Sequence, residues 1–188
     1  NLNALSENMM DLMQNALDKA SHNKNVRVII ISGEGSTFSS GHDLKELKAA
    51  RKGADKGKKY FLKIMKKCSK MMKTIIKCPK PVIAEVSGTA TAAGCQLVAS
   101  CDLAYASSEA KFATPGINIG LFCSTPMVAI SRNLSNKHSM EMLLTGELIA
   151  SDKAANIGLI NEVVKNDNLR DFVLSKAQII SEKSSMTL

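Results

Sequence analysis

The residues best suited to chemistry lie in a turn of small side chains at positions 87–94, between a buried apolar run and a helix. The helix is expected to open near Ala93, and its first N–H groups have no partner within the helix. With the positive end of the helix dipole behind them, such groups can hold a negatively charged oxygen, as in an oxyanion hole. A plain structural role also fits, because small residues let a strand and a helix pack closely. The turn alone leaves both interpretations open.

A second loop of small residues occupies positions 33–41, G-E-G-S-T-F-S-S-G, and leads into the helix start H-D-L-K-E-L. It follows the apolar run V-R-V-I-I-I-S at 26–32, which predicts a strand. The branched apolar residues of that run indicate burial on both faces, as in a parallel sheet covered by helices. The chain therefore offers two strand-to-helix loops with room for a ligand.

The elements that must position these loops alternate between strand and helix. Helices are expected over 6–22, with Ser6 as N-cap, and over 57–77, with core-facing stripes that include Leu12 and Ile76. The remaining elements are strands at 82–86, 102–106 and 159–164, an irregular loop at 112–126, and helices at 126–132, 137–144, 151–156 and from 169 onward. This alternation predicts an α/β fold with right-handed crossovers in one domain.

Composition limits the class of protein. With 188 residues, 45% hydrophobic and 22% charged, the chain is typical of a globular domain, and no apolar run approaches the ~20 residues that span a bilayer. The five cysteines lie in apolar segments without metal-ligand spacing, so we expect reduced core thiols, a reducing compartment and no metal site. Cys95 and Cys123 are expected to be packing residues. We recognise no targeting segment between Asn1 and Leu188.

The net charge of +8 is concentrated in one segment, because residues 51–80 hold twelve Lys or Arg and one acidic residue, Asp55. On a helix this pattern fits a solvated face, an electrostatic aid to phosphate binding, or a nucleic-acid patch. Only Tyr60 and Phe61 could stack on bases there. The sequence therefore favours the solvated face, and nucleic acid is not an expected partner.

Six motifs resemble, in order and spacing, the landmarks of the crotonase family, the enoyl-CoA hydratase/isomerase superfamily. They are N-L-N-A-L-S at 1–6, F-S-S-G-H-D-L at 38–44, the stretches 81–102 and 112–120, M-L-L-T-G-E-L-I at 142–149, and A-N-I-G-L-I-N-E-V-V at 155–164. The resemblance implies a spiral of ββα units with parallel sheets covered by helices. It also implies a single domain over 1–188 that lacks the family's first strands and its C-terminal trimerisation helices.

The resemblance further implies binding of an acyl-CoA thioester, with the backbone N–H groups of His42 and Ala93 as the oxyanion hole. Coenzyme A is then part of the substrate, and no separate cofactor is expected. A homotrimer or dimer of trimers, in fatty-acid metabolism in the mitochondrial matrix, is implied as well. The expected contacts to the substrate are Ala4, Leu5, Ser40, Asp43, Leu44, Lys45, Gly88, Ala92 and Pro115.

The carboxylates of a hydratase are missing from the positions that the resemblance assigns to them. Hydration of a 2-enoyl thioester needs a base to activate water and an acid to protonate the α-carbon. Gln96 and Gly116 stand at the two glutamate positions, and Ser124 stands at a third acid position of some isomerases and dehalogenases. We therefore expect weak or no hydratase activity. The alternatives are a decarboxylase, isomerase or thioesterase on an unidentified acyl-CoA, and a non-enzymatic RNA-binding or regulatory scaffold.

Overall fold

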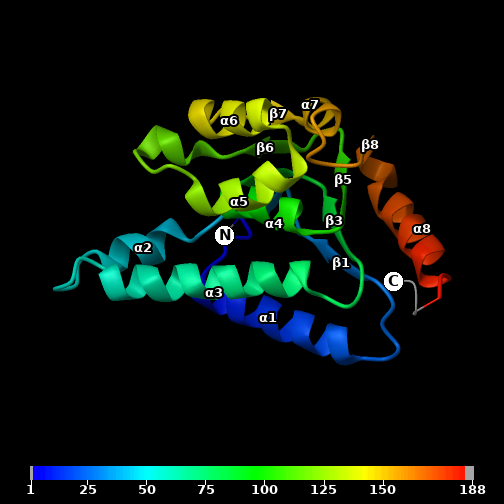
Figure 1. Ribbon diagram of the computed structural model, residues 1–188, viewed down its shortest axis with the longest axis horizontal. Coiled ribbons are helices and arrows are strands. Elements are labelled where there is room, and N and C mark those ends of the chain that lie inside the picture. Colours follow the sequence, from blue (N-terminus) through cyan, green and yellow to red (C-terminus); the bar gives the residue numbers. More distant parts are fainter. Residues whose placement is uncertain (1, 185–188) are drawn as a thin grey trace.

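Two four-stranded sheets surrounded by helices form the computed structural model, which describes residues 2–184 (Figure 1). Asn1, the first residue of the N-L-N-A-L-S motif, and residues 185–188 lie outside the described range. The first sheet is parallel and has the order β1 (Ile29–Ser32), β3 (Val82–Val86), β5 (Leu103–Ser107), β8 (Glu162–Val164). The second has the order β2 (Thr37–Ser39), β4 (Thr89–Thr91), β6 (Lys111–Ala113), β7 (Ile149–Ala150), and its β6–β7 pair is antiparallel.

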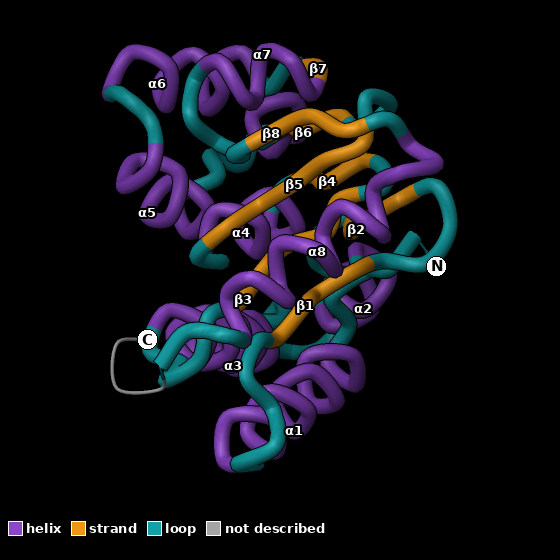
Figure 2. Tube along the Cα trace, turned by 90° about the vertical axis from the view of Figure 1, so that its right-hand side faces the viewer, coloured by secondary structure: helices purple, strands orange, loops and turns teal. Residues whose placement is uncertain are grey.

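The chain passes repeatedly from the first sheet to the second and then into helices. Figure 2 shows β8, β5, β3 and β1 of the first sheet side by side. Along the chain, β1, β3 and β5 are each followed by a strand of the second sheet, namely β2, β4 and β6. This ββα repetition confirms the predicted α/β spiral. The short strands β2 and β6 lie in segments that the sequence predicted as loops, because three residues with a single large apolar side chain, Phe38 or Phe112, are too few to show an alternation.

The helices surround these sheets. Their bounds are α1 Glu7–His22, α2 Leu44–Ala50, α3 Lys58–Ile76, α4 Ala93–Ser100, α5 Ser124–Asn133, α6 Asn136–Thr145, α7 Ser151–Asn156 and α8 Leu169–Ser181, with 3-10 turns at Pro115–Ile119 and Asn166–Asn168. Ser6 caps α1 as predicted, since its Oγ accepts from the Met9 N–H at 3.1 Å. α1 and α3 run side by side (Figure 1), and Lys67 joins them through ion pairs to Glu7 and Asp11.

The centre of the molecule is α4, all eight of whose residues are buried. One apolar cluster extends from α1 and α3 through α4 to strands of both sheets, and a smaller cluster lies under α8. Because α4 begins directly after β4, the burial of this helix fixes the position of the small-residue turn that precedes it.

The prediction for the first strand is confirmed in part. β1 pairs in parallel with β3, and its two faces pack against different apolar clusters, Ile29 and Ile31 against the main cluster and Ile30 against the cluster under α8. The three isoleucines are nevertheless only half-buried and Ser32 is exposed, because β1 is an edge strand whose only described neighbour is β3. Leu12 and Ile76 are also exposed, at 57% and 48%, since each lies at the margin of its helix's apolar stripe.

Candidate functional site

The two small-residue loops meet at one edge of the second sheet. β2 and β4 are parallel neighbours, so the segments that follow their carboxyl ends, Gly41–His42 and Ala92–Ala93, lie together. A β-carbon built on Gly41 would lie 3.0 Å from Ala92 Cβ and 3.1 Å from the Ala93 nitrogen. Gly41 also has φ +84°, a conformation that favours glycine. The close approach of these loops thus depends on the absence of a side chain at position 41.

Both predicted oxyanion donors are available. Neither the His42 N–H nor the Ala93 N–H donates a hydrogen bond to another residue within 2–184. Ala93 is the first residue of α4, and no side chain caps this helix. Two unpaired N–H groups beside a helix N-terminus are the arrangement that stabilises a developing oxyanion.

The residue before Ala93 is held in a strained conformation. Ala92 has φ 51° and ψ −119°, which is the glycine-favouring first central position of a type II′ turn. Its own N–H donates to Ala113 O at 2.9 Å, which ties the turn to β6. Strain of this kind costs on the order of 1–3 kcal/mol and is concentrated at functional sites, so it supports a specific role for this turn.

The N-terminal segment lies against the His42 loop. Leu5 N–H donates to Gly41 O at 2.7 Å, and Ser40 N–H donates to Leu2 O at 3.1 Å. Asp43 caps α2 by accepting from the N–H groups of the first turn of that helix, including Lys45 N–H at 2.8 Å. The structure thus gathers, around the His42 donor, the predicted contact residues Ala4, Leu5, Ser40, Asp43, Leu44 and Lys45.

Two further residues predicted to contact the substrate, Pro115 and Gly88, lie at opposite ends of β4. Pro115 begins the 3-10 turn after β6, beside Ala92 at the carboxyl end. Gly88 lies at the amino end, where a β-carbon on it would be 2.1 Å from Ser36 O. The small size of Gly88 is therefore needed for backbone packing away from the two donors, and its contact with substrate stays a prediction.

The two glutamate positions differ in how much room they offer. Gln96 is 7% exposed on α4, one turn after Ala93, and its Oε1 is buried without a hydrogen-bond partner. Gly116 has no such space, because a β-carbon on it would lie 2.3 Å from Leu121 O and 2.7 Å from Cys123 Sγ. Ser124 is exposed at the start of α5. Of the two glutamate positions, only position 96 thus accommodates a side chain of the size of glutamate.

The imidazole of His42 is also buried, and neither ring nitrogen has a hydrogen-bond partner. Burial lowers the pKa of His42, and this is opposed by the backbone of Leu5 and by the carboxylate of Glu46. The neutral imidazole is therefore the stable form in the fold.

This pKa shift predicts a pH dependence of stability. As the pH falls through about 6.5, the imidazole of the unfolded chain gains a proton, whereas the buried imidazole of the folded chain, with its lowered pKa, stays neutral to lower pH. Protonation therefore favours the unfolded chain, and the free energy of unfolding should decrease as the pH is lowered from about 6.5. A His42→Gln variant should show a flatter decrease in urea unfolding experiments between pH 7 and pH 5, whereas the exposed-site variant His22→Gln should follow the wild type. Equal slopes for wild type and His42→Gln would contradict the assignment.

The thiols near the site are unreactive in character. Burial, and then the neighbouring Cys123, raises the pKa of Cys95 to about 12, and burial also raises the pKa of Cys123. Both therefore stay protonated near neutral pH, which fits the packing role predicted for them. All five cysteines are free thiols.

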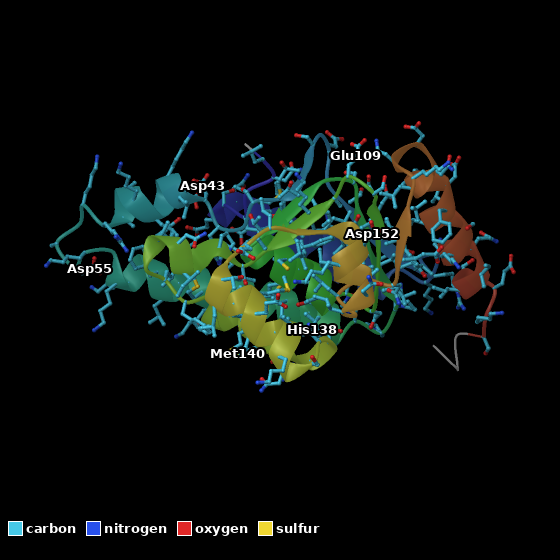
Figure 3. All side chains as sticks on the ribbon, turned by 90° about the horizontal axis from the view of Figure 1, so that it is seen from above. Asp43, Asp55, Glu109, His138, Met140 and Asp152 are labelled. Carbon is cyan, nitrogen blue, oxygen red and sulfur yellow. The ribbon has the colours of Figure 1, made fainter. Side chains whose placement is uncertain are left out.

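The basic segment forms much of one end of the molecule, near Asp43 and Asp55 in Figure 3. Its two aromatic residues are already engaged: Tyr60 OH donates to Glu46 Oε2 at 2.9 Å, and the Arg51 guanidinium lies 5.8 Å from the Phe61 ring centroid. These contacts support a solvated basic face over a base-stacking surface.

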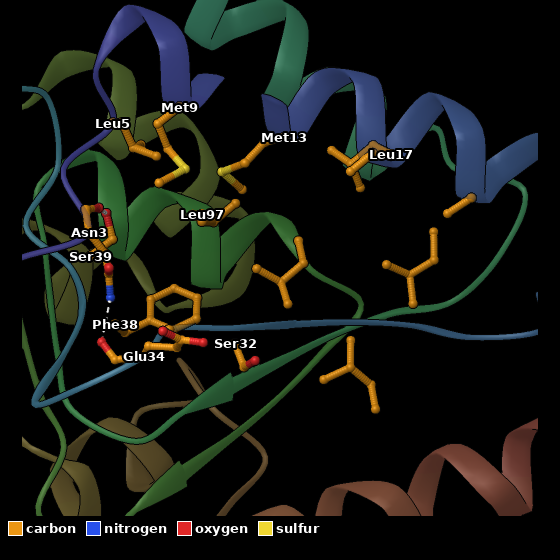
Figure 4. Close-up of a pocket in the computed structure, with 16 residues that line it drawn as sticks. Asn3, Leu5, Met9, Met13, Leu17, Ser32, Glu34, Phe38, Ser39 and Leu97 are labelled. Atoms are coloured by element: carbon orange, nitrogen blue, oxygen red, sulfur yellow. Dashed lines mark hydrogen bonds between the residues drawn. The ribbon is translucent and has the colours of Figure 1, made fainter. Parts of the chain in front are cut away.

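Two hollows lie near the site. A cavity of about 520 Å³, the β1 cavity, lies between α1, β1 and α4, where Figure 4 shows Met9, Met13 and Leu17 facing Phe38 and Leu97. Its lining includes neither oxyanion donor nor Gln96. A pocket of about 210 Å³, the α3–α5 pocket, lies between α3, α4 and α5, and Gln96 lines it. Sequence patterns do not predict this pocket, because its walls come from three separate helices.

Within residues 2–184, no group of three or more His, Cys, Asp or Glu side chains is placed to hold a metal ion. None of the described helices is long and apolar enough to cross a membrane.

Comparison with known proteins agrees with the predicted resemblance. The family model described as Enoyl-CoA hydratase/isomerase matches residues 1–188. The mitochondrial enoyl-CoA hydratase domain-containing protein 3 of Xenopus laevis is 51% identical over 168 residues, which is 89% of this chain and 55% of that protein. The human protein of the same name is 47% identical over 182 residues, 97% of this chain and 58% of that protein.

Solved structures show the same likeness. The crystal structure of human enoyl Coenzyme A hydratase domain-containing protein 3 superposes with a TM-score of 0.90 at 46% identity, over 97% of this chain and 70% of that one. An enoyl-CoA hydratase from Mycobacterium smegmatis has a TM-score of 0.92 at 44% identity, over 98% and 70%. The chain spans 55–61% of the length of five curated relatives that carry the name enoyl-CoA hydratase domain-containing protein 3, mitochondrial.

Proposed function

The chain belongs to the enoyl-CoA hydratase/isomerase family, and on that premise we propose that it binds an acyl-CoA thioester. The thioester oxygen is held by the N–H groups of His42 and Ala93. The observation that carries this proposal is the contact at Gly41, whose β-carbon position lies 3.1 Å from the Ala93 nitrogen while both donors are unpaired. Two loops that are far apart in sequence thus lie close together, and each carries an N–H group without a partner in residues 2–184.

Such a pair of donors acts when negative charge develops on the thioester oxygen. Removal of an α-proton, or loss of carbon dioxide from an α-carboxylate, sends an electron pair into the carbonyl and forms an enolate. Each donor is worth about 3 kcal/mol of barrier, because it is already oriented before the charge appears.

Hydration is not the reaction that these residues favour. Gln96 cannot exchange a proton near neutral pH, and Gly116 has no side chain, so acid–base help worth about 10²–10⁴-fold in rate is absent. We therefore propose that the protein acts in lipid metabolism and has weak or no hydratase activity. Decarboxylation of a malonyl-type thioester remains open to the site, because the electrons come from the bond that breaks. The alternative that we propose is an isomerase or thioesterase reaction on the same class of substrate, an acyl-CoA thioester.

The oxyanion site can be tested without knowledge of the native substrate. Acetoacetyl-CoA forms an enolate whose ultraviolet absorbance reports stabilisation of that anion by two donors. We expect the protein to shift bound acetoacetyl-CoA toward the enolate at neutral pH. Saturable binding without this absorbance would leave CoA recognition intact and contradict the oxyanion hole, whereas absence of binding would contradict the whole proposal.

The loss of acid–base groups can be tested at position 96. A Gln96→Glu variant places a carboxyl in a buried site, where desolvation raises its pKa toward the range useful for proton transfer. We expect the variant to hydrate crotonyl-CoA at least 10-fold faster than the wild type, measured by loss of the conjugated-thioester absorbance. Gln178→Glu, an exposed change on α8, is the matched control. Brisk hydration by the wild type would show that another group supplies the proton.

We also propose that the protein acts as a homotrimer or a dimer of trimers in the mitochondrial matrix. The location is supported by the names of the Xenopus and human relatives and by five cysteines that are all free, as in a reducing compartment. Sedimentation analysis measures the assembly, and a monomer as the sole species would contradict that part of the proposal.

A further inference from the structure

Apolar side chains of α3 and α5, the two helices that pack on α4, form half of the lining of the α3–α5 pocket. They are Met65, Cys68, Met72, Ile76, Val128 and Ala129, and their helices can be followed in Figure 1. Methionine side chains adapt their shape to a flexible apolar guest, so these walls suit an alkyl chain.

The pocket and the proposed oxyanion site share the helix α4, which supplies Gln96 and Ser100 to the pocket and begins at Ala93. Ala93, Gln96 and Ser100 are spaced i, i+3 and i+7, so they follow one face of the helix. Gln96 and Ser100 line the pocket, and the buried Gln96 Oε1 has no partner. At 1.5 Å per residue, Ser100 lies about 10 Å along the helix from Ala93. A chain whose thioester is held at Ala93 can extend along this face into the pocket.

Two exposed cations line the pocket, Lys73 of α3 and Arg132 of α5. Within residues 2–184 neither makes an ion pair with a carboxylate, unlike Lys63 and Lys67, which lie on the side of α3 that faces α1 and pair with Glu7. A pocket with apolar walls and two unpaired cations in its lining complements a chain with an apolar middle and an anionic end.

We propose that the site selects an acyl thioester whose chain ends in a carboxylate, an ω-carboxyacyl thioester. The inference rests on the proposed function for the thioester end, and it adds Lys73 and Arg132 as the residues that recognise the far end. A simple fatty acyl chain would fill the same apolar walls and leave both cations without a partner.

The selectivity is measured by calorimetric titration with three CoA thioesters of matched length. They are suberoyl-CoA, octanoyl-CoA and the monomethyl ester of suberoyl-CoA, which is neutral at its far end. We expect suberoyl-CoA to bind about tenfold more tightly than the other two, with a smaller advantage at high salt. Equal affinities would overturn the selectivity and leave the proposed function standing. If none of the three binds, the proposed function fails together with this inference.

Variants locate the selectivity. Lys73→Met and Arg132→Met keep an apolar stem and remove the charge, so each should lower the suberoyl-CoA affinity about threefold to tenfold and leave that of octanoyl-CoA unchanged. Lys70→Met is the matched control, because Lys70 is an exposed lysine of the same helix that does not line the pocket. An equal loss in Lys70→Met would overturn the assignment, since it would indicate attraction by the basic face in general. Thermal unfolding of each variant checks that the fold is kept.

Discussion

Gly41→Ala is expected to abolish most of the enolate stabilisation that we predict for bound acetoacetyl-CoA, with about a 100-fold loss. The new β-carbon would lie 3.0 Å from Ala92 Cβ and 3.1 Å from the Ala93 nitrogen, so the two loops must move apart. Movement of the Ala93 N–H takes one of the two donors away from the oxygen that it should stabilise. The measurement is the enolate absorbance at saturating ligand, together with the dissociation constant.

Gly35→Ala is a closely matched control for this change. Gly35 has φ +81°, almost the same as the +84° of Gly41, but no atom lies within 4 Å of its β-carbon position. Both variants therefore carry the left-handed strain of a non-glycine residue, about 1–2 kcal/mol, and only Gly41→Ala crowds the site. An equal loss of enolate signal in both variants would show that backbone strain, and not donor position, controls the effect.

The small-residue turns were predictable from the sequence, but their partners were not. Periodicity and turn composition located both ends of α1 and α3 and the start of α4 within a few residues, and identified two strand-to-helix loops. The sequence left open whether these loops served packing or chemistry. The two interpretations are compatible at position 41, because close packing of two backbones is what brings the predicted donors together. A contact between residues 41 and 93 depends on strand order in the second sheet, which local patterns do not carry.

The strands of the second sheet and the α3–α5 pocket could not be predicted from the sequence. β2, β4, β6 and β7 contain two or three residues each, too few for an alternating pattern to be visible. Arg132 and Lys73 lie on different helices and become neighbours of one pocket only through the packing of α3 and α5 around α4. The unpaired oxygen of Gln96 is likewise a property of its surroundings, because the residue type alone does not tell whether its amide has partners.

Gly94→Ala is expected to destabilise the fold strongly. The new β-carbon would lie 2.2 Å from Ser39 O and 2.8 Å from Ser39 Cβ, so the start of α4 must shift away from the end of β2. Crowding of backbone against backbone costs about 3 kcal/mol or more, and the better helix propensity of alanine returns about 1 kcal/mol. The expected net loss of about 2–3 kcal/mol lowers Tm by about 4–12 °C in a chain of this size, measured by calorimetry.

Gly53→Ala provides the comparison, because its β-carbon would be 3.3 Å from the nearest atom, Ala50 O, and its Tm should change by no more than a few degrees. The contact between Gly94 and Ser39 holds the segment before His42 against the residue after Ala93, so it fixes the separation of the two donors as well as the fold. Gly94→Ala should therefore lose enolate stabilisation even at temperatures where it is fully folded. A variant that kept both its Tm and its enolate signal would show that α4 does not approach β2 this closely in solution, and the geometry of the oxyanion site would then need another origin.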